Sequence, residues 1–238
     1  MTDTEEKYFA QRFRLWSRYD EGVVMDKESW YSVTPEAIAG HIAKRSAEVL
    51  TQNGGRPRVV LDAFCGAGGN AIQFAKYFDR VIAVDIDPEK IALARKNAAV
   101  YGVEKKIEFQ TRDFFEASKT VEADVVFLAP PWGGPLYHYS AYYDLADTVP
   151  STLDILKATS RISANIVLYL PRHARAEQLT RMAKKGDQCE VEHNLINGKC
   201  KSLTAYYGLL IDGSKTKLIP KEGPTVASLC VSKRQKLV

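Results

Sequence analysis

The sequence contains little of what marks disulfide-bonded, zinc-binding or membrane-spanning proteins. It has four cysteines in 238 residues, at positions 65, 189, 200 and 230, and none belongs to a CxxC pair. The four histidines do not cluster with the cysteines, so no zinc site is expected. Scattered cysteines without a signal peptide are typical of a reducing compartment. No apolar run approaches the roughly 20 residues that a membrane helix needs. We therefore expect a soluble, intracellular protein without a metal.

Charge of one sign is not in strong excess either. Lys and Arg number 33 and Asp and Glu number 29, which gives a net charge of +4 and a pI of about 8.7. This mild basic excess permits an anionic partner but does not require one. With 45% hydrophobic residues, the chain is long enough for one sizeable core with some additions.

Three regions of the chain differ in their patterning. Residues 1–50 are expected to form a helical N-terminal extension, residues 51–211 an α/β domain, and residues 212–238 a C-terminal tail with little periodicity. In the extension, Phe9, Phe13 and Trp16 recur at helical spacing. This spacing predicts a helix that packs its aromatic side chains on the main domain. Basic residues lie on the other faces of this helix and can meet an anion: Lys7, Arg12, Arg14 and Arg18.

A second helix is predicted within residues 32–50 of the extension. Thr34 is expected to be its N-cap, Pro35 its first helical residue, and Glu36 a residue of its first turn. These are the usual signals for the start of a helix, so we expect the helix to begin at Pro35.

Strands and helices alternate in the central region. The last two apolar runs flank Asn197-Gly198, which is a strong hairpin signal. Strand–helix repeats followed by a hairpin predict a doubly wound sheet with an antiparallel edge. The predicted strands cover residues 58–64, 80–86, 106–115, 123–131 and 165–171, and the predicted helices cover residues 71–78, 87–102, 151–162 and 174–185.

A glycine-rich turn follows the first predicted strand. "LDAFCGAGGN" places Gly66 and Gly68 between strand and helix, where they allow a tight turn and close approach of a ligand to the backbone. Asp62 precedes the glycines, Asp85 ends the second strand, and Asp113 ends the third. These carboxylates form a row along the edge at which open α/β sheets bind ligands, and Asp85 is placed to accept hydrogen bonds from ribose hydroxyls.

Two cofactors fit this row of residues. GAGGNA is close to the GxGxxA turn that binds NAD. The pattern DxFxGxGG, however, resembles the first motif of class I S-adenosylmethionine-dependent methyltransferases. An NAD enzyme has no need of Asp62 before the glycines or of a proline pair after the fourth strand, so S-adenosyl-L-methionine is the expected cofactor.

The fourth predicted strand ends on "APPW", residues 129–132. Pro130 and Pro131 have fixed dihedrals and donate no hydrogen bond, so they can hold carbonyl groups outward at the sheet edge. Trp132 adds a flat ring on which a base can stack. The stretch resembles the [D/N/S]-P-P-[Y/F/W] motif of methyltransferases that act on exocyclic amines. In that family the carbonyl oxygens orient the amine toward the methyl group, and positioning can supply much of the rate.

Six stretches together make the resemblance specific. The sequence is similar to the catalytic domain of the trimethylguanosine synthase family from about Lys7 to Leu210. This resemblance implies a class I S-adenosylmethionine-dependent methyltransferase, with a Rossmann-like doubly wound sheet, an antiparallel C-terminal hairpin and a helical N-terminal extension. The stretches are "QRFRLWSRYDEG", "WYSVTPEAIAGHIA", "DAFCGAGGNAIQFA", "VIAVDIDPEKIALARKNAAVYG", "DVVFLAPPWGGPLY" and "NIVLYLPR".

The resemblance also implies a substrate and roles for particular residues. The family methylates the exocyclic amine of 7-methylguanosine caps twice, on small nuclear and nucleolar RNAs, in the nucleus. Ala129 stands where the family commonly has serine, so the amine must be held by backbone carbonyls. The implied catalytic residues are Ala129, Pro130, Pro131 and Trp132, the cap-binding residues Trp132, Lys7 and Arg172, and the cofactor-binding residues Thr34, Asp62, Phe64, Gly66, Gly68, Asp85, Asp113 and Phe114.

The physical chemistry of Trp132 agrees with such a substrate. A 7-methylguanine ring carries a positive charge, and an indole face attracts a cation by roughly 0.5–2 kcal/mol. Two other functions are weighed beside it: a cap-binding module without catalysis, which Ala129 favours, and an amino methyltransferase that acts on another base. A module would not need Asp62 and Asp85. We expect a monomer that binds 7-methylguanosine-capped RNA and does not bind membranes.

Overall fold

The strands of this sheet form where short apolar runs can be covered on both faces. The computed structural model describes residues 9–133, 143–145, 148–175, 178–179 and 188–213. In the parallel part, every residue of β4 and β5 is buried, which is the burial expected of a sheet with helices on both sides. The bounds are β1 Val59–Asp62, β2 Arg80–Asp85, β3 Ile107–Thr111, β4 Val125–Leu128, β5 Ile166–Pro171, β6 Glu190–Ile196 and β7 Lys199–Tyr206.

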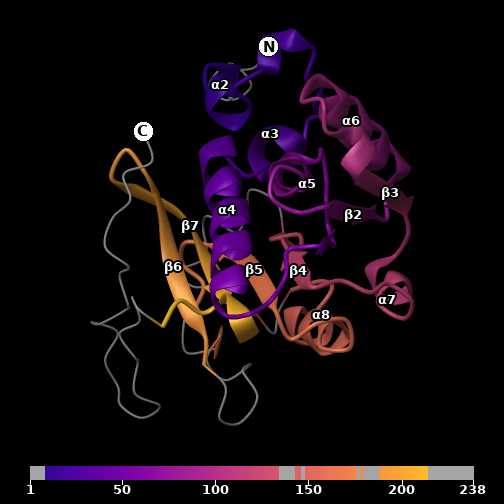
Figure 1. Cartoon of the computed structure of the whole chain (residues 1–238). Coiled ribbons are helices and arrows are strands. Elements are labelled where there is room, and N and C mark those ends of the chain that lie inside the picture. Colours follow the sequence, from indigo (N-terminus) through magenta and orange to yellow (C-terminus); the bar gives the residue numbers. More distant parts are fainter. Residues whose placement is uncertain (1–8, 134–142, 146–147, 176–177, 180–187, 214–238) are drawn as a thin grey trace.

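The seven strands form one sheet in the order β3-β2-β1-β4-β5-β7-β6 (Figure 1). The first five in this order are parallel, whereas β7 is antiparallel to both β5 and β6. β6 and β7 are joined at Asn197 and Gly198, whose φ angles of 51° and 74° are those of a two-residue hairpin turn. The predicted doubly wound sheet and its antiparallel hairpin are therefore confirmed.

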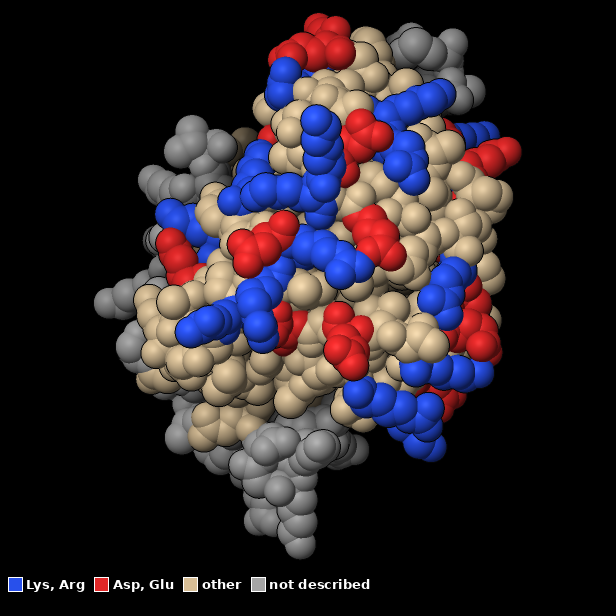
Figure 2. All heavy atoms as spheres, turned by 45° about the vertical axis from the view of Figure 1, so that its right-hand side comes forward, with Lys and Arg blue, Asp and Glu red and all other residues tan. Residues whose placement is uncertain are grey.

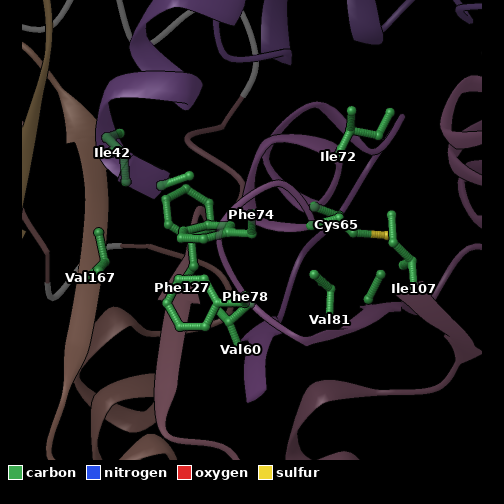
Figure 3. Packing of buried hydrophobic residues seen from close by; sticks show 14 of the residues in the cluster. Ile42, Val60, Cys65, Ile72, Phe74, Phe78, Val81, Ile107, Phe127 and Val167 are labelled. Atoms are coloured by element: carbon green, nitrogen blue, oxygen red, sulfur yellow. The ribbon is translucent and has the colours of Figure 1, made fainter. Parts of the chain in front are cut away.

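Helices cover both faces of the sheet. On one face α4, α5 and α6 pack on a core that includes Phe74 and Phe127, which Figure 3 shows at close range. On the other face α7 and α8 enclose a second core. The helices are α2 Arg12–Leu15, α3 Ser29–Ser32, α4 Glu36–Gln52, α5 Gly69–Phe74, α6 Pro88–Val100, α7 Phe114–Ala117 and α8 Thr152–Thr159, and the short 3-10 turns are η1 Tyr19–Glu21, η2 Glu104–Lys106 and η4 Gly208–Leu210.

The N-terminal region differs from the prediction. The single helix predicted to carry Phe9, Phe13 and Trp16 is wrong, because residues 9–34 form the four-residue α2, the turn η1 and the short α3. Trp16 is buried as expected, but Phe9 and Phe13 are 38% and 49% exposed. The reason is local, since the chain leaves the helical conformation at Trp16, which is extended with φ −145° and ψ 107°.

Thr34 is not an N-cap, which corrects the prediction for α4. The helix begins at Glu36, and the preceding Pro35 is extended with ψ 134° and holds the cap position. The Thr34 hydroxyl instead accepts a hydrogen bond from Asn70 Nδ2 at 2.9 Å. Two predictions concern residues outside the described part for most of their length, namely the helix over 174–185 and the tail over 212–238.

A buried polar network joins α4 to the hairpin. His41 Nε2 lies 2.8 Å from Glu192 Oε1, and the Tyr206 hydroxyl donates to Glu192 Oε2 at 2.9 Å. Arg45 forms an ion pair with Glu190 at 2.7 Å and stacks over the Tyr206 ring. Burial alone raises the pKa of Glu192, but the hydrogen bond from His41 and the charges of His41 and Arg45 outweigh it and lower that pKa. The network holds the hairpin against α4, the helix that begins two residues after the cavity residue Thr34.

Candidate active site

A cavity of about 380 Å³ lies at the carboxyl ends of the parallel strands. This size falls in the usual range for small-molecule sites. The glycine turn, the ends of β2 and β4, and part of the N-terminal region line it. In an open parallel sheet, the loops that follow neighbouring strands leave a crevice at the carboxyl ends of those strands. The sheet topology therefore determines where the cavity lies.

The glycine turn is held against the end of β2 by hydrogen bonds. Cys65 N–H donates to the Val84 carbonyl at 2.9 Å, and Gly66 N–H donates to Asp85 Oδ2 at 2.9 Å. Gly66 and Gly68 have φ angles of 51° and 90°, which favour glycine. A side chain on Gly68 would also meet the backbone of Ala94 on α6 at 3.1 Å. Gly66 lines the cavity. Gly68 does not, but its lack of a side chain allows α6 to pack closely against the turn.

Asp85 is one of the ionisable groups that line the cavity. Its carboxylate accepts from Gly66 N–H on Oδ2 and from Asp87 N–H, at 3.1 Å, on Oδ1. Burial raises the pKa of Asp85, and these two N–H groups and the charge of Lys90 offset part of the rise. Each carboxylate oxygen keeps a further lone pair for a ligand. Asp85 can therefore accept hydrogen bonds from a diol without losing the bonds that hold it.

Asp62 lies behind the cavity wall and is fully buried. Neither carboxylate oxygen makes a hydrogen bond of standard geometry with the described residues. Burial and the nearby charge of Asp85 raise the pKa of Asp62 to about 7, although the N–H groups of Ala71 and Phe64 lie near enough to offset a part of this rise. A buried carboxylate without a full set of partners is unusual, and such groups cluster at functional sites.

Residues 22–34, which we call the strap, close the cavity from the N-terminal side. Asn97 on α6 is fully buried and exchanges two hydrogen bonds with Val24, at 2.8 and 2.9 Å. The same amide donates to the carbonyl of Ala67 in the glycine turn at 2.9 Å. One side chain therefore ties the strap and the glycine turn together.

A second anchor of the strap is ionic. Lys90 Nζ lies 2.6 Å from Asp26 and 3.0 Å from Glu28, and only 9% of its side chain is exposed. Burial lowers the pKa of Lys90, but the hydrogen bonds that Lys90 donates to these two carboxylates outweigh it and raise that pKa, so Lys90 is charged. Glu28 and Lys90 both line the cavity. The strap therefore forms part of the cavity wall and contributes a charged side chain, Glu28, to it.

Apolar groups line the side of the cavity next to Asp85. Ile86 is 70% exposed although it is a large aliphatic residue. Phe114 is buried, and its ring centroid lies 5.3 Å from that of Phe64. Asp113 also lines the cavity, but its carboxylate is engaged in capping α7 by accepting from Phe115 and Glu116 N–H. A flat ligand placed here would cover Ile86 while its polar part meets Asp85.

The proline–tryptophan stretch forms the opposite end of the same cavity. Ala129, Pro130, Pro131 and Trp132 all line it. Trp132 is half-buried, and its ring lies 5.4 Å from that of Tyr169 on β5 at an interplanar angle of 31°. The ring is thus supported from one side by a buried neighbour. Trp132 packs against both hydrophobic cores and also lines the cavity.

The structure brings most of the predicted residues together. Asp62 and Gly68 lie behind the wall, and Lys7 lies outside the described residues. Arg172 follows β5, is exposed and does not line the cavity. The predicted residues that do line the cavity are Thr34, Phe64, Gly66, Asp85, Asp113, Phe114, Ala129, Pro130, Pro131 and Trp132.

Several lining residues are absent from the sequence-based set. Ile86 and Lys90 follow the second strand on the ligand edge, and that position is the signal that could have found them. Tyr31 and Ser32 of the strap gave no such signal, because nothing local indicates which surface the strap covers. In the described part of the chain, no group of three metal-ligating side chains comes together, and no helix is long and apolar enough to cross a membrane.

The strand order and the cavity define the class of protein. A parallel sheet in which an antiparallel β7 lies between β5 and β6, with its cavity at the first glycine turn, is the fold of class I methyltransferases. A solved putative methyltransferase from Porphyromonas gingivalis W83 shares it, with a TM-score of 0.67 and 13% identity over 87% of this chain and 49% of that chain.

The family follows from sequence comparison. The family model described as RNA cap guanine-N2 methyltransferase matches residues 57–210. The trimethylguanosine synthase of Schizosaccharomyces pombe is 37% identical over 86% of both chains, and that of Saccharomyces cerevisiae is 36% identical over 85% of this chain and 67% of its own. This chain belongs to the RNA cap guanine-N2 methyltransferase family.

Proposed function

We propose that this enzyme converts a 7-methylguanosine cap to 2,2,7-trimethylguanosine by two methyl transfers from S-adenosyl-L-methionine to the exocyclic amine. The family model and the two trimethylguanosine synthases support cap methylation. The structural observation that carries the proposal is one cavity with two unlike ends. Asp85 at the end of β2 defines one end and the Ala129–Trp132 stretch after β4 the other, because β2 and β4 lie on opposite sides of β1.

The residues of the first end fit S-adenosyl-L-methionine. Asp85 has spare acceptor capacity for the ribose hydroxyls, and Ile86 and Phe114 offer apolar surface to the adenine. Burial and the charge of Asp85 raise the pKa of Asp62 to about 7, and a cation bound nearby would lower it by stabilising the carboxylate. When bound, the cofactor supplies an electrophilic methyl group on a sulfonium, and no metal is needed for the transfer.

The second end fits a cationic base. The indole of Trp132 attracts the positively charged 7-methylguanine ring and stacks on it, whereas plain guanine gains only the stacking. Tyr169 holds the indole from behind. Trp132 therefore makes the enzyme select caps that already carry the 7-methyl group.

Backbone groups position the amine. Ala129 has no side-chain acceptor, and the two prolines have no N–H, so carbonyl oxygens of this turn are the acceptors that can face an amine. Each methylation removes one N–H, so a turn that offers only acceptors suits both steps. These carbonyl oxygens would hold the amine toward the methyl group that S-adenosyl-L-methionine would supply, and water would accept the proton that the amine gives up.

The proposal extends to the physiological substrates. Small nuclear and nucleolar RNAs are the proposed substrates, the nucleus is the proposed location, and Lys7 and Arg172 are the proposed contacts of the cap phosphates. We also propose that the enzyme acts as a monomer, as sedimentation velocity can measure. Arg172 follows β5 on the ligand edge of the sheet and is exposed, which leaves its guanidinium accessible to a phosphate.

The test is mass spectrometry of 7-methylguanosine diphosphate after incubation with S-adenosyl-L-methionine. We expect gains of one and two methyl groups with the wild type and a rate at least tenfold lower with Trp132→Ala, because stacking and cation–π attraction are both lost. Tyr77→Ala serves as the control, since Tyr77 is 40% exposed and lies away from the cavity lining.

Two results would contradict parts of the proposal. No methyl gain with intact binding of the cap would favour a cap-binding module, and Ala129→Ser would then be the first variant to assay. Equal rates on guanosine diphosphate and its 7-methyl form would refute the selection by Trp132.

A further inference from the structure

An exposed cluster of aromatic rings and arginine lies in the N-terminal region, outside the cavity. Phe9, Tyr19 and Trp30 pack together, with ring centroids 5.6–6.0 Å apart. Arg12 lies over two rings at once, 4.4 Å from the centroid of Phe9 and 4.3 Å from that of Phe13. We call these five residues the aromatic–arginine surface.

The aromatic residues of the N-terminal region differ in how far they are buried, and this difference distinguishes a ring with a structural role from rings that a ligand can reach. Trp16 is 1% exposed and belongs to the main core, so it accounts for the anchoring of the segment. Phe9 and Phe13 are 38% and 49% exposed and add little to that core. Large rings left at the surface beside arginine form the combination that proteins use to bind single-stranded nucleic acid.

The aromatic–arginine surface is continuous with the active site. Trp30 belongs to α3, and the next two residues of that helix, Tyr31 and Ser32, line the cavity. Figure 1 shows α2 and α3 at the same end of the molecule. A chain attached to a base in the cavity would reach these rings within a few nucleotides of leaving the rim at α3.

Two of the three arginines in this segment pair with acidic residues, Arg12 with Asp20 and Arg18 with Glu21. Arg12, Arg14 and Arg18 lie within seven residues. Arg12 pairs with Asp20 only at 3.4 Å, and Arg14 is exposed with its guanidinium on the Gln11 side chain. On the face shown in Figure 2, basic and acidic side chains are interspersed. Binding of RNA phosphates would therefore depend on the positions of individual basic side chains, because the face as a whole is not basic.

We propose that the aromatic–arginine surface binds the first nucleotides of the single-stranded RNA that follows the cap. The inference rests on the proposed function, because it takes the cap to be in the cavity. Phe13 stacks on a base with the ring face that Arg12 does not cover, and Arg14 contacts a phosphate. Stacking is tolerant of base identity, so the contact adds affinity for capped RNA without reading its sequence.

The test compares a capped, unstructured ten-nucleotide RNA with the dinucleotide m7GpppG, by fluorescence anisotropy and by the KM for methyl transfer. Phe13→Ala is expected to weaken binding of the RNA about five- to tenfold and to leave the dinucleotide unchanged. Arg14→Ala is expected to lower the slope of log K against log salt by about 0.7 for the RNA alone. Matched controls are Tyr77→Ala, an exposed ring elsewhere, and Lys44→Ala, a 58% exposed cation on α4.

Three outcomes overturn the proposal. Unchanged RNA binding in both variants excludes the contact. An equal loss for RNA and dinucleotide places the effect in the cavity or the fold. A concentration-dependent dimer that Phe13→Ala abolishes, with RNA affinity intact, assigns the surface to self-association. If the wild type methylates neither ligand, the proposed function fails, but the RNA-to-dinucleotide binding ratio still tests the surface.

Discussion

The β6–β7 hairpin and the ligand edge of the sheet differ in the hydrogen bonds that they give to a buried carboxylate. In the hairpin, Glu192 is 9% exposed and both of its oxygens have partners, His41 and the Tyr206 hydroxyl. At the ligand edge, Asp62 is fully buried, and neither oxygen has a partner of standard geometry among the described residues. The pKa of Glu192 is lowered, whereas that of Asp62 is raised to about 7.

The difference separates structure from function. A buried carboxylate with full partners holds elements together, and nothing is left with which to bind a ligand. A buried carboxylate without them destabilises the fold in its ionised form, so its presence needs another reason. At the ligand edge that reason is a site that is completed by its ligand. Substitutions at the two ends should therefore change different observables.

The largest expected effect is at the hairpin end, for Arg45→Met. This change keeps an unbranched apolar stem but removes the guanidinium, which leaves buried Glu190 without its cation. We expect the free energy of unfolding, measured with urea, to fall by about 3–5 kcal/mol. The affinity for S-adenosyl-L-homocysteine, measured by calorimetry on the folded protein, should not change. Lys44→Met on the exposed side of α4 is the control, and a similar loss there would remove the distinction between buried and exposed pairs.

Asp62→Asn should reveal the cost of the unpaired carboxylate through pH. The folded pKa is about 7 against 3.8 for the free group, so the folded state binds the extra proton in between. The wild type therefore loses stability relative to Asp62→Asn as pH rises from about 4 to 7, by up to about 4 kcal/mol.

The same titration in Glu192→Gln sharpens the comparison. The folded pKa of Glu192 is lowered, so its contribution is present above the unfolded pKa and is lost as pH falls through the folded pKa. The two difference curves should therefore slope in opposite directions when unfolding is measured in urea at several pH values. Parallel curves would mean that the two carboxylates do not differ as described.

Asp85→Asn should affect binding more than stability. Asparagine keeps one acceptor oxygen and loses the charge, so one of the bonds to Gly66 and Asp87 N–H is weakened together with the diol contact. We expect the affinity for S-adenosyl-L-homocysteine to fall about ten- to a hundredfold. Asp87→Asn is the matched control, because Asp87 caps α6 and asparagine caps equally well. An equal loss in both variants would show a general charge effect in place of a specific contact.

The smallest expected effect is at Thr34. Its hydroxyl accepts from Asn70 Nδ2 and is 3% exposed, so Thr34→Val leaves a buried amide without this acceptor. We expect a loss of about 1–2 kcal/mol in the free energy of unfolding, and nearly none for Thr34→Ser, which keeps the hydroxyl. A larger loss in Thr34→Ser than in Thr34→Val would show that the methyl group matters more than the hydrogen bond.

Local chemistry explains which features could be predicted from the sequence. The glycine turn, the acids at strand ends and the Asn197-Gly198 hairpin depend on a few neighbouring residues. The buried pair of His41 and Glu192 joins residues 151 apart, and no local pattern indicates it. The role of Asn97 depends on the strap lying against α6, which no spacing encodes. Thr34 carried the usual cap signal, but the extended Pro35 moved the helix start.

The position of β7 has a consequence for how the chain folds during synthesis. The last strand to be made lies between β5 and β6, so β6 has no place in the sheet until residues 199–206 have left the ribosome. Until then the buried strand β5 presents an unpaired apolar edge, which is the kind of edge that other chains can join. The hairpin is therefore a late closing element of the described sheet, and β5 keeps an open edge in the nascent chain until β7 has been made.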